Sequence, residues 1–574
     1  MKKTVLGAIK LLSSKERRGL VLILLLAAIA AILQIVSVLS IMPFIMLLSN
    51  PELIESNEIL QTLYQAFGFT SFTQFLTTFG ILGVLVLSIG NGFLAFENWL
   101  SFRYVNRLGF RLKKKMLERV LKQPYEFFLG HHSGELSNVI LEQVDRVVGG
   151  IIGTFIVLFS NLALTLAIAL ILVLVSWQTT LITLLGLLLL YLSVFVGLRH
   201  AIESHGRQLT SLSSKIFSAI KESIEGIKEI KTRRAETYFA DKFSEPGMRM
   251  THLNVRFNLL STLPSFILET VLFAGLVAIA LVFILSGDDG SYSLSFIALY
   301  GLAIYRLAPA LKAVFASVAE IHHSADALRI VESYRQSKAE RRRQITMLSV
   351  DGELRIKDVS YRYPGADADQ LRNIDMTIKL GSSVCLFGHS GSGKSTLINL
   401  LAGLIMPTKG KILIGGESRD EDNIDTWRDR IGFLPQQIYL VDDTIASNIA
   451  FGQQKALIDK ERVIEVSKIA NIHQFVNDEL PLGYETVVGE NGASLSGGQR
   501  QRIGIARSLY YNPDILIYDE SFSGLDEKNR LEILDNLLAL ENKTIILSSH
   551  EKDVASRCRD LIQFEAGTII NKDR

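Results

Sequence analysis

The stretch Gly388-His-Ser-Gly-Ser-Gly-Lys394-Ser395 decides the fold of the C-terminal part of this 574-residue chain. It follows the apolar segment Val384-Cys-Leu-Phe387 and precedes the helical composition of Thr396-Leu-Ile-Asn-Leu-Leu401. A strand, a glycine-rich loop and a helix in this order form a P-loop, because glycines let backbone N–H groups converge on phosphates at a helix N-terminus. The sequence therefore predicts a nucleotide-phosphate site made by Gly388, His389, Ser390, Gly391, Ser392, Gly393, Lys394, Ser395 and Thr396.

Two acids end an apolar segment further along, in Ile515-Leu-Ile-Tyr-Asp519-Glu520. Adjacent acids at a strand end are often merely solvated, but a P-loop needs such a pair. Lys394 is expected to neutralise the β- and γ-phosphates of ATP, and the Ser395 hydroxyl and Asp519 to hold Mg²⁺. Glu520 can then polarise the attacking water. The residues predict an ATPase of α/β fold.

Apolar segments dominate the N-terminal part, and 48% of all residues are hydrophobic. Six stretches are long enough to cross a bilayer of roughly 30 Å. They are 19–48, 74–102, 151–176, 179–198, 258–285 and 292–317. The first is too long for a signal peptide and lacks a clear cleavage site, so we interpret it as a spanning helix.

Basic residues set the orientation of these predicted spans. The segment 49–73 has no Lys or Arg, whereas 103–122 and 199–257 are rich in both. Positive charge marks the cytoplasmic side. The pattern predicts a multi-pass protein of the inner (cytoplasmic) membrane with both termini in the cytoplasm.

Composition divides the chain into three parts. We predict a transmembrane domain over 1–330, a basic, polar linker over 331–353 and a nucleotide-binding domain over 354–574. The net charge of +2 gives no support to nucleic-acid binding. Cys385 and Cys558 are read as reduced, buried residues rather than a disulfide or metal site.

Three shorter segments of the membrane part also carry a prediction. Residues 133–138 and 225–231 place glycine beside a charged turn, which fits a helix reversal that docks on another domain, although a solvated loop is the alternative. Residues 57–67 have apolar positions at helical spacing. They predict a short amphipathic helix on the outer membrane face, which either contacts lipid or caps the bundle.

The whole chain resembles an ATP-binding cassette (ABC) exporter half-transporter, and the most specific mark is Leu495-Ser-Gly-Gly-Gln-Arg-Gln-Arg502. This stretch matches the signature that separates ABC ATPases from other P-loop proteins. The resemblance implies a membrane all-α domain of six helices, of the ABC exporter type, followed by an α/β P-loop ABC ATPase domain. The implied activity is ATP hydrolysis coupled to transport.

The resemblance also assigns roles to single residues. Tyr363 matches the aromatic ring that stacks on adenine, Gln436 a contact of Mg²⁺ and water, and His550 the switch histidine on the γ-phosphate. The catalytic set is thus Glu520, His550 and Gln436, with Asp526 in the D-loop. Residues 486–490 resemble an exporter segment that touches the docking turns, and Gly524 stands where alanine is commoner.

The signature implies that one chain is insufficient. In this family its residues reach the γ-phosphate held by a second subunit; here they are Leu495, Ser496, Gly497, Gly498 and Gln499. Because Glu520 and His550 are both present, a homodimer with two complete sites is favoured, and a heterodimer remains the alternative. A non-transport ABC ATPase is disfavoured by the six spans.

The transported substrate is the least defined prediction. Residues 123–128 and 226–231, among others, look like the branch of exporters that flips lipid-linked oligosaccharides, while related sequences export peptides or drugs. Arg306 lies inside the sixth apolar stretch, where it could hold a pyrophosphate, with Lys312 adding to the field. Alternatively, Arg306 pairs with Glu269 and locks the bundle. The expected partners are a second copy of the chain, membrane lipids and an amphipathic or lipid-linked substrate.

Overall fold

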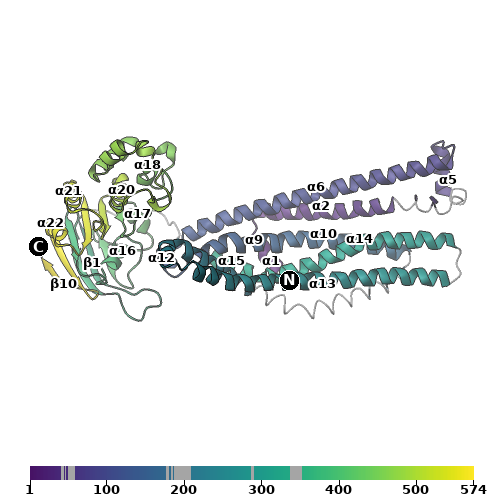
Figure 1. The fold of residues 1–574 in the computed structure, drawn as a ribbon, viewed down its shortest axis with the longest axis horizontal. Coiled ribbons are helices and arrows are strands. Elements are labelled where there is room, and N and C mark those ends of the chain that lie inside the picture. Colours follow the sequence, from purple (N-terminus) through teal and green to yellow (C-terminus); the bar gives the residue numbers. More distant parts are fainter. Residues whose placement is uncertain are drawn as a thin grey trace. The chain divides into compact units, whose positions relative to one another are not determined.

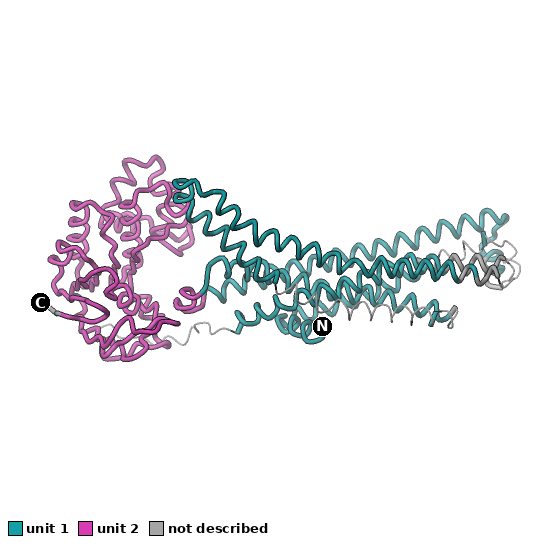
Figure 2. The backbone as a smooth tube through the Cα atoms, turned by 60° about the horizontal axis from the view of Figure 1, so that its bottom comes forward, with its two compact units in different colours: residues 1–121, 131–338 teal, residues 122–130, 339–574 magenta. Residues whose placement is uncertain are grey.

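A computed structural model describes most of the chain. The described residues are 1–40, 58–175, 208–285, 290–336 and 352–573, with isolated positions within 44–48 and 177–185. The chain divides into two compact units (Figure 2). Unit 1 comprises residues 1–121 and 131–338, and unit 2 comprises 122–130 and 339–574. The short segment 122–130 therefore groups with the C-terminal part of the chain.

The described part of unit 1 is helical throughout. Its elements are α1 (Lys2–Lys10), α2 (Ser14–Leu39), α5 (Glu58–Ala66), α6 (Phe72–Leu121), α8 (Ser133–Asn138), η1 (Val139–Gln143), α9 (Val144–Val147), η2 (Val148–Gly153), α10 (Thr154–Val175), α12 (Ile227–Arg233), α13 (Glu236–Leu285), α14 (Gly290–His323) and α15 (Ala325–Gln336), with a further helical stretch over 208–225. In Figure 1 the long helices lie side by side. Helix α2 packs against α6 and α10, and α14 packs against α10 and α13.

Five helices of the described residues are long and apolar enough to cross a membrane. They run over Ser14–Ser37, Phe72–Leu121, Ser133–Leu174, Glu236–Ala278 and Tyr300–Gln336, so they overlap five of the six predicted spans. The predicted span 179–198 lies almost wholly outside the described residues. Large apolar side chains such as Leu25, Ile81 and Leu174 are exposed on these helices, as lipid-facing surfaces require.

The helix predicted for 57–67 is confirmed as α5. Of the two turns expected to dock, 133–138 forms α8 within unit 1, whereas the preceding segment 122–130 belongs to unit 2. Pro124 precedes the short helix α7 (Tyr125–Leu129) as its N-cap and separates it from α6. Near the second turn, Gly226 caps α12, which lies between 208–225 and α13.

The helix that leads into α10 is irregular. Elements η1 and η2 are π-helical turns on either side of α9. Gly150, in η2, packs closely against Ser324, the residue that precedes α15. A Cβ on Gly150 would lie 2.3 Å from the Ser324 hydroxyl oxygen. π-helical turns are often found beside functional sites.

Unit 2 contains two sheets and the helices packed on them. The strands are β1 (Glu353–Tyr361), β2 (Leu371–Lys379), β3 (Ser383–Phe387), β4 (Lys409–Ile414), β5 (Glu417–Ser418), β6 (Ile431–Leu434), β7 (Ile515–Asp519), β8 (Thr544–Ser549), β9 (Asp560–Glu565) and β10 (Thr568–Asp573). The first sheet has the order β2-β1-β4-β5 and is antiparallel. The second has the order β10-β9-β3-β8-β7-β6 and is parallel except at β10.

The remaining helical elements of unit 2 are α7, α16 (Lys394–Leu401), α17 (Ile424–Arg428), α18 (Ile445–Ile449), η3 (Lys455–Leu457), α19 (Lys460–Ile469), η4 (Phe475–Glu479), η5 (Gly483–Glu485), η6 (Glu490–Gly492), α20 (Gly497–Tyr510), α21 (Glu527–Leu538) and α22 (Lys552–Arg557). Strand β7 shows how the core is shared. Ile515 and Ile517 pack with the residues of the first sheet, while Leu516 and Tyr518 pack with those of α18 to α21. Successive side chains of a strand point to opposite faces, so β7 lies between two apolar cores.

Candidate functional site

The predicted ATP-site residues gather at one edge of the large sheet of unit 2. Strands β3, β8, β7 and β6 are parallel neighbours, so their carboxyl ends lie together. The P-loop follows β3, Glu520 follows β7, His550 follows β8, and Gln436 comes shortly after β6. Ligands of open α/β sheets bind at such an edge.

The P-loop has the backbone that its glycines predict. Gly393, directly before α16, has a φ of 105°, a backbone conformation that residues with a side chain rarely adopt. At Gly388 a Cβ would lie 2.4 Å from the Phe564 carbonyl oxygen, so only glycine fits. Lys394 is 3% exposed, and its Nζ donates to the carbonyl oxygens of Gly388 at 2.8 Å and His389 at 2.9 Å. Its ammonium group is thus held at the mouth of the loop.

Glu520 is the centre of the predicted catalytic set. Its Oε2 accepts a hydrogen bond from Gln436 Nε2 at 3.0 Å. Its Oε1 lies 3.5 Å from Lys394 Nζ and 3.9 Å from His550 Nδ1. Glu520 has φ 44°, a strained conformation for a residue with a side chain, of the kind found at active sites. Three residues that are far apart in sequence therefore converge on one carboxylate.

Asp519 lies next to this cluster, and it is 6% exposed. Its Oδ1 accepts hydrogen bonds from Ser395 Oγ at 3.2 Å and from Ser548 Oγ at 2.6 Å. Ser548 Oγ also accepts from the Glu520 backbone N–H at 2.9 Å. The Ser395 hydroxyl and the Asp519 carboxylate are hard oxygen donors brought together beside Lys394, a set that fits Mg²⁺. Sequence reasoning missed Ser548.

Tyr363 is tied to the P-loop helix. Its hydroxyl lies 3.2 Å from Thr396 Oγ1, and its ring meets that of Tyr361 edge-on, with centroids 4.9 Å apart. Tyr361 is buried, and its hydroxyl donates to Glu126 Oε1 of α7 at 3.0 Å. Burial first, and then this bond to Glu126, raise the pKa of Tyr361. Sequence reasoning missed the pair of Glu126 and Tyr361.

The signature residues form the exposed start of α20. Ser496 is its N-cap, and its Oγ accepts from the Gln499 backbone N–H at 3.2 Å while the Gln499 side chain accepts from the Ser496 N–H at 2.7 Å. This capping box fixes the first turn. Leu495 is buried beneath it, whereas Ser496 and Gly497 are exposed. The helix start therefore presents N–H groups that can bind an anion.

The D-loop aspartate caps another helix. Asp526 accepts from the side chain of Asn529 at 2.7 Å and from its backbone N–H at 3.2 Å, and these bonds hold the pKa of Asp526 below its usual range. At Gly524 a Cβ would lie 2.8 Å from the Gln501 side-chain amide. A side chain at this position would therefore require the end of the Gln501 side chain to shift.

The segment 486–490 is anchored to the start of α18. Thr486 O accepts from the Ile445 backbone N–H at 3.0 Å, and Val488 donates its N–H to Asp443 O at 3.1 Å. Val487 and Glu490 are exposed. The segment therefore presents side chains at the surface of unit 2.

Unit 1 contains a cavity of about 480 Å³ among its membrane-spanning helices. Arg306 lines it, and Arg306 Nη1 donates to Gln34 Oε1 at 2.7 Å. In the described part of the chain no ion pair joins Arg306 to Glu269. Glu269 and Lys312 are exposed and do not line this cavity. The structure therefore places Arg306 against Gln34, a partner that the sequence did not suggest.

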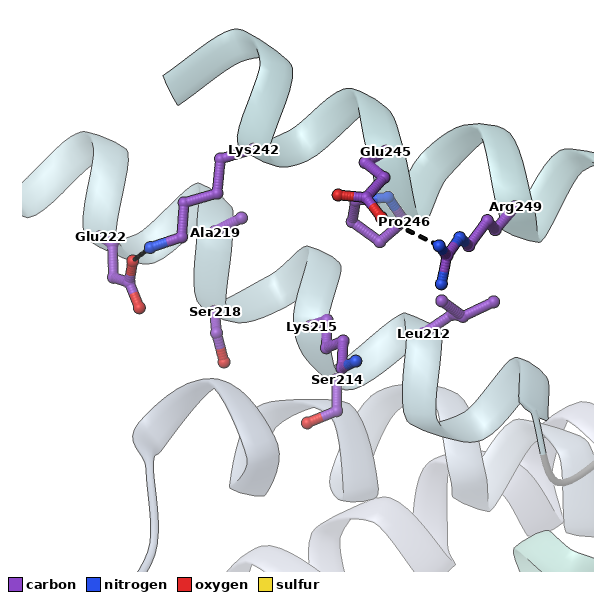
Figure 3. Close-up of a pocket in the computed structure, with 10 residues that line it drawn as sticks. All are labelled: Leu212, Ser214, Lys215, Ser218, Ala219, Glu222, Lys242, Glu245, Pro246 and Arg249. Carbon is purple, nitrogen blue, oxygen red and sulfur yellow. Dashed lines mark hydrogen bonds and ion pairs between the residues drawn. The ribbon is translucent and has the colours of Figure 1, made fainter. Parts of the chain in front are cut away.

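A second cavity, of about 330 Å³, lies between 208–225 and α13 (Figure 3). Its charged side chains are largely matched with one another. Lys242 pairs with Glu222, and Arg249 lies 3.1 Å from Glu245 (Figure 3). This matching makes it a weaker candidate for a ligand site than the cavity that contains Arg306.

Comparison with known proteins agrees with this geometry. The profile of the ABC transporter transmembrane region matches residues 19–305, and that of the ABC transporter family matches 371–523. The ATP-dependent lipid A-core flippase of Saccharophagus degradans is 30% identical over 502 residues, which are 85% of this chain and 83% of that protein. The flippase of the same name from Pseudomonas aeruginosa is 28% identical over 469 residues, 80% of this chain and 76% of that protein.

Among solved structures, a bacterial Atm1-family ABC exporter with ATP bound has the same fold. The TM-score is 0.79 at 19% identity, over 97% of this chain and 94% of that one. The chain belongs to the ABC transporters and is a half-transporter of the exporter type, with a membrane region followed by an ABC ATPase domain. It is a multi-pass membrane protein that binds ATP and couples its hydrolysis to export, and a half-transporter works as a dimer.

Proposed function

We propose that two copies of this chain form a flippase that moves a glycolipid, such as a lipid-linked oligosaccharide, outward from the cytoplasmic leaflet of the inner membrane. The main support for a glycolipid substrate is the similarity, over most of the chain, to proteins called lipid A-core flippases. An arginine in the membrane cavity adds to it, because a guanidinium can hold a phosphate head group bidentately. The absence of Lys and Arg from 49–73 supports cytoplasmic termini.

In this proposal each ATP lies between two subunits. Tyr363 stacks on adenine, and Lys394 with the P-loop N–H groups holds the phosphates. The exposed start of α20 in the second subunit closes the site. Ser395, Asp519 and Gln436 would hold Mg²⁺, which offsets the phosphate charge when bound.

Glu520 is the proposed general base. Gln436 and His550 flank its carboxylate, so they position the water and the γ-phosphate around it. Its position on a strained turn after a buried strand fixes the carboxylate in one place. A positioned general base contributes roughly 10²–10⁴-fold to a rate. Asp526, at the cap of α21, completes the inter-subunit face.

A transport assay tests the substrate class. The purified protein is reconstituted in liposomes with a radiolabelled polyprenyl-pyrophosphate oligosaccharide, and a lectin added to one side reports the exposed sugar. We expect ATP-dependent exposure by the wild type and none by Glu520→Gln. Transport of a cationic dye or a peptide, with no movement of the glycolipid, would instead support the multidrug or peptide exporter.

A further inference from the structure

The membrane cavity that contains Arg306 also contains an acid with no assigned role. The cavity is walled by α2, α6, η2, α10 and α14, and its polar lining includes Gln34, Glu97, Asn98, Ser160, Asn161 and Arg306. Glu97 lies in the predicted span 74–102 and is 3% exposed. An acid inside a membrane-spanning segment is costly, and such residues mark sites of function.

The basic side of the cavity is held in place by a buried amide. Gln34 is 2% exposed; its Oε1 accepts from Arg306, and its Nε2 donates to Asn91 Oδ1 at 3.1 Å. Within the described residues, this is the one hydrogen bond that Arg306 donates. Since a guanidinium has five N–H donors, several remain for an anion.

The acidic side is separate from it. Glu97 Oε1 accepts from Ser101 Oγ at 2.9 Å, one turn along the same helix. Among the described residues, no ion pair joins Glu97 to Arg306 or to another cation. A carboxylate has about four acceptor positions, so Glu97 can still accept hydrogen bonds from a ligand. Two opposite charges thus line one cavity without neutralising each other directly.

The neighbouring amides add acceptors to the acidic side. Asn98 Nδ2 donates to Leu94 O at 3.0 Å, and Asn161 Nδ2 donates to Val157 O at 2.9 Å. The donors of both amides are therefore partly engaged with their own helices, and their carbonyl oxygens are left as acceptors. Glu97 and the two amides are complementary to a ligand that donates several hydrogen bonds, and Arg306 is complementary to an anion.

We propose that Glu97 is a specificity residue that accepts hydrogen bonds from sugar hydroxyls of the substrate while Arg306 binds the adjoining phosphate. This inference deepens the proposed function and rests on it. A glycosyl phosphate carries an anion next to a set of hydroxyl donors, which matches the two sides of the cavity. Apolar lining residues such as Leu94, Phe102 and Leu164 suit the start of the lipid chain.

Binding to three lipids tests this assignment. The full-length protein in nanodiscs is titrated with polyprenyl-phosphoryl-glucose, with polyprenyl methyl phosphate (the same charge without the sugar) and with phosphatidylethanolamine. We expect the wild type to bind the glucosyl lipid at least about tenfold tighter than the methyl diester, since hydrogen bonds to a charged group are worth about that much. Glu97→Gln should strongly reduce this preference, because a neutral amide oxygen is a weaker acceptor than a carboxylate, and should keep the affinity for the methyl diester. Arg306→Gln should weaken binding of both.

Control variants separate this role from a structural one. Glu118→Gln removes an exposed acid of the same helix and should leave all affinities unchanged. Glu97→Asp keeps the charge and should recover part of the preference for the sugar. Basal ATPase and dimer size report on folding. If Glu97→Gln folds badly, the answer comes from Glu97→Asp, which overturns the inference if it binds both polyprenyl lipids as the wild type does.

The outcomes distinguish the two proposals. If Glu97→Gln kept the preference for the glucosyl lipid, Glu97 would have no part in sugar recognition. A wild type that preferred phosphatidylethanolamine, with the preference lost in Glu97→Gln, would show that Glu97 binds an ammonium group and would also overturn the inference. A wild type that bound neither polyprenyl lipid would refute the proposed function, and the inference with it.

Discussion

Gly524 lies where an added methyl group would meet the side chain of Gln501. The side chain of Gln501 occupies the space where a Cβ would stand, 2.8 Å away, and its Oε1 is buried without a hydrogen-bond partner in the described structure. We expect Gly524→Ala to displace Gln501 and to cost about 1 kcal/mol, as modest overpacking does. Thermal unfolding of the full-length protein in nanodiscs measures this loss.

A second substitution provides the control. Gln501→Ala removes the obstacle, so Gly524→Ala should cost little when it is made in that background. Equal losses of stability in both backgrounds would show that the contact with Gln501 is not the reason for glycine at this position.

Local sequence patterns identify only some of the residues that converge on Glu520. A strand followed by a glycine-rich loop and a helix is a contiguous pattern, so the P-loop and Lys394 could be read from the chain. Gln436 and His550 have no such local pattern and were assigned through a family resemblance. Ser548 escaped notice because a serine at a strand end has no distinctive spacing.

The membrane residues were harder to predict. Arg306 stands out in an apolar stretch, but sequence does not show which helices face each other. Pairing with Glu269 was therefore one of two alternatives for Arg306, whereas the structure places Arg306 against Gln34 of α2. Glu97 was overlooked although a lone acid inside an apolar stretch is itself a signal. Helix packing, which is non-local, brings Glu97 and Arg306 to one cavity.

At the scale of elements, the first turn of α20 depends on its capping box. Ser496→Ala should destabilise this helix start by about 1 kcal/mol, as loss of an N-cap typically does. The ATPase rate should fall by more than that loss explains, because Ser496 also faces the ATP of the second subunit in the proposed dimer. Unfolding and steady-state hydrolysis of the same preparations test both statements.

Asp459 offers a matched helix start. Its side chain caps α19 by accepting from the Arg462 backbone N–H at 3.1 Å. Asp459→Ala should cost a similar amount of stability and leave hydrolysis nearly unchanged. If the two variants lost activity equally, the signature serine would act only as a cap.

The contact of α7 with β1 is a second element-scale feature. The first turn expected to dock was placed at 133–138, but 122–130 is the segment within unit 2. Pro124, which ends the preceding helix, was the better signal. Within unit 2, the bond between Glu126 and Tyr361 joins α7 to β1, the strand that precedes Tyr363.

Tyr361→Phe tests this link. Loss of the hydroxyl leaves a carboxylate oxygen without its donor, so we expect faster amide hydrogen exchange over 122–130 with little change in ATP affinity. Tyr511→Phe removes a hydroxyl that donates to Phe451 O elsewhere in unit 2 and should leave 122–130 unaffected. Unchanged exchange in Tyr361→Phe would mean that other contacts hold α7.

The raised pKa of Tyr361 sets the pH range of this bond. The folded state holds the phenolic proton of Tyr361 more tightly than the unfolded state does. The contribution of this bond to the stability of the folded state is therefore fully present below the ordinary tyrosine pKa of about 10. It is lost as the pH rises beyond that value. Exchange over 122–130 should therefore show no Tyr361-dependent transition between about pH 6 and 9.

At the scale of the whole molecule, the proposed ATP site is divided between two copies of the chain. In the proposed dimer, the P-loop cluster around Glu520 would supply a base and a cation, and the exposed start of α20 would supply an anion-binding surface to the other copy. We therefore propose that ATP closes two copies of unit 2 on each other and that hydrolysis releases them.

A distance between the two copies of unit 2 reports whether ATP closes them. A spin label is attached to a cysteine introduced by Lys528→Cys, in a Glu520→Gln background in which Cys385 and Cys558 are replaced by alanine. Pulsed electron paramagnetic resonance then measures the distance between the labels on the two copies. With ATP and Mg²⁺ we predict a single narrow, short distance, which Ser496→Ala removes. A distribution unchanged by ATP, or full wild-type hydrolysis by a lone subunit in a nanodisc, would contradict the account.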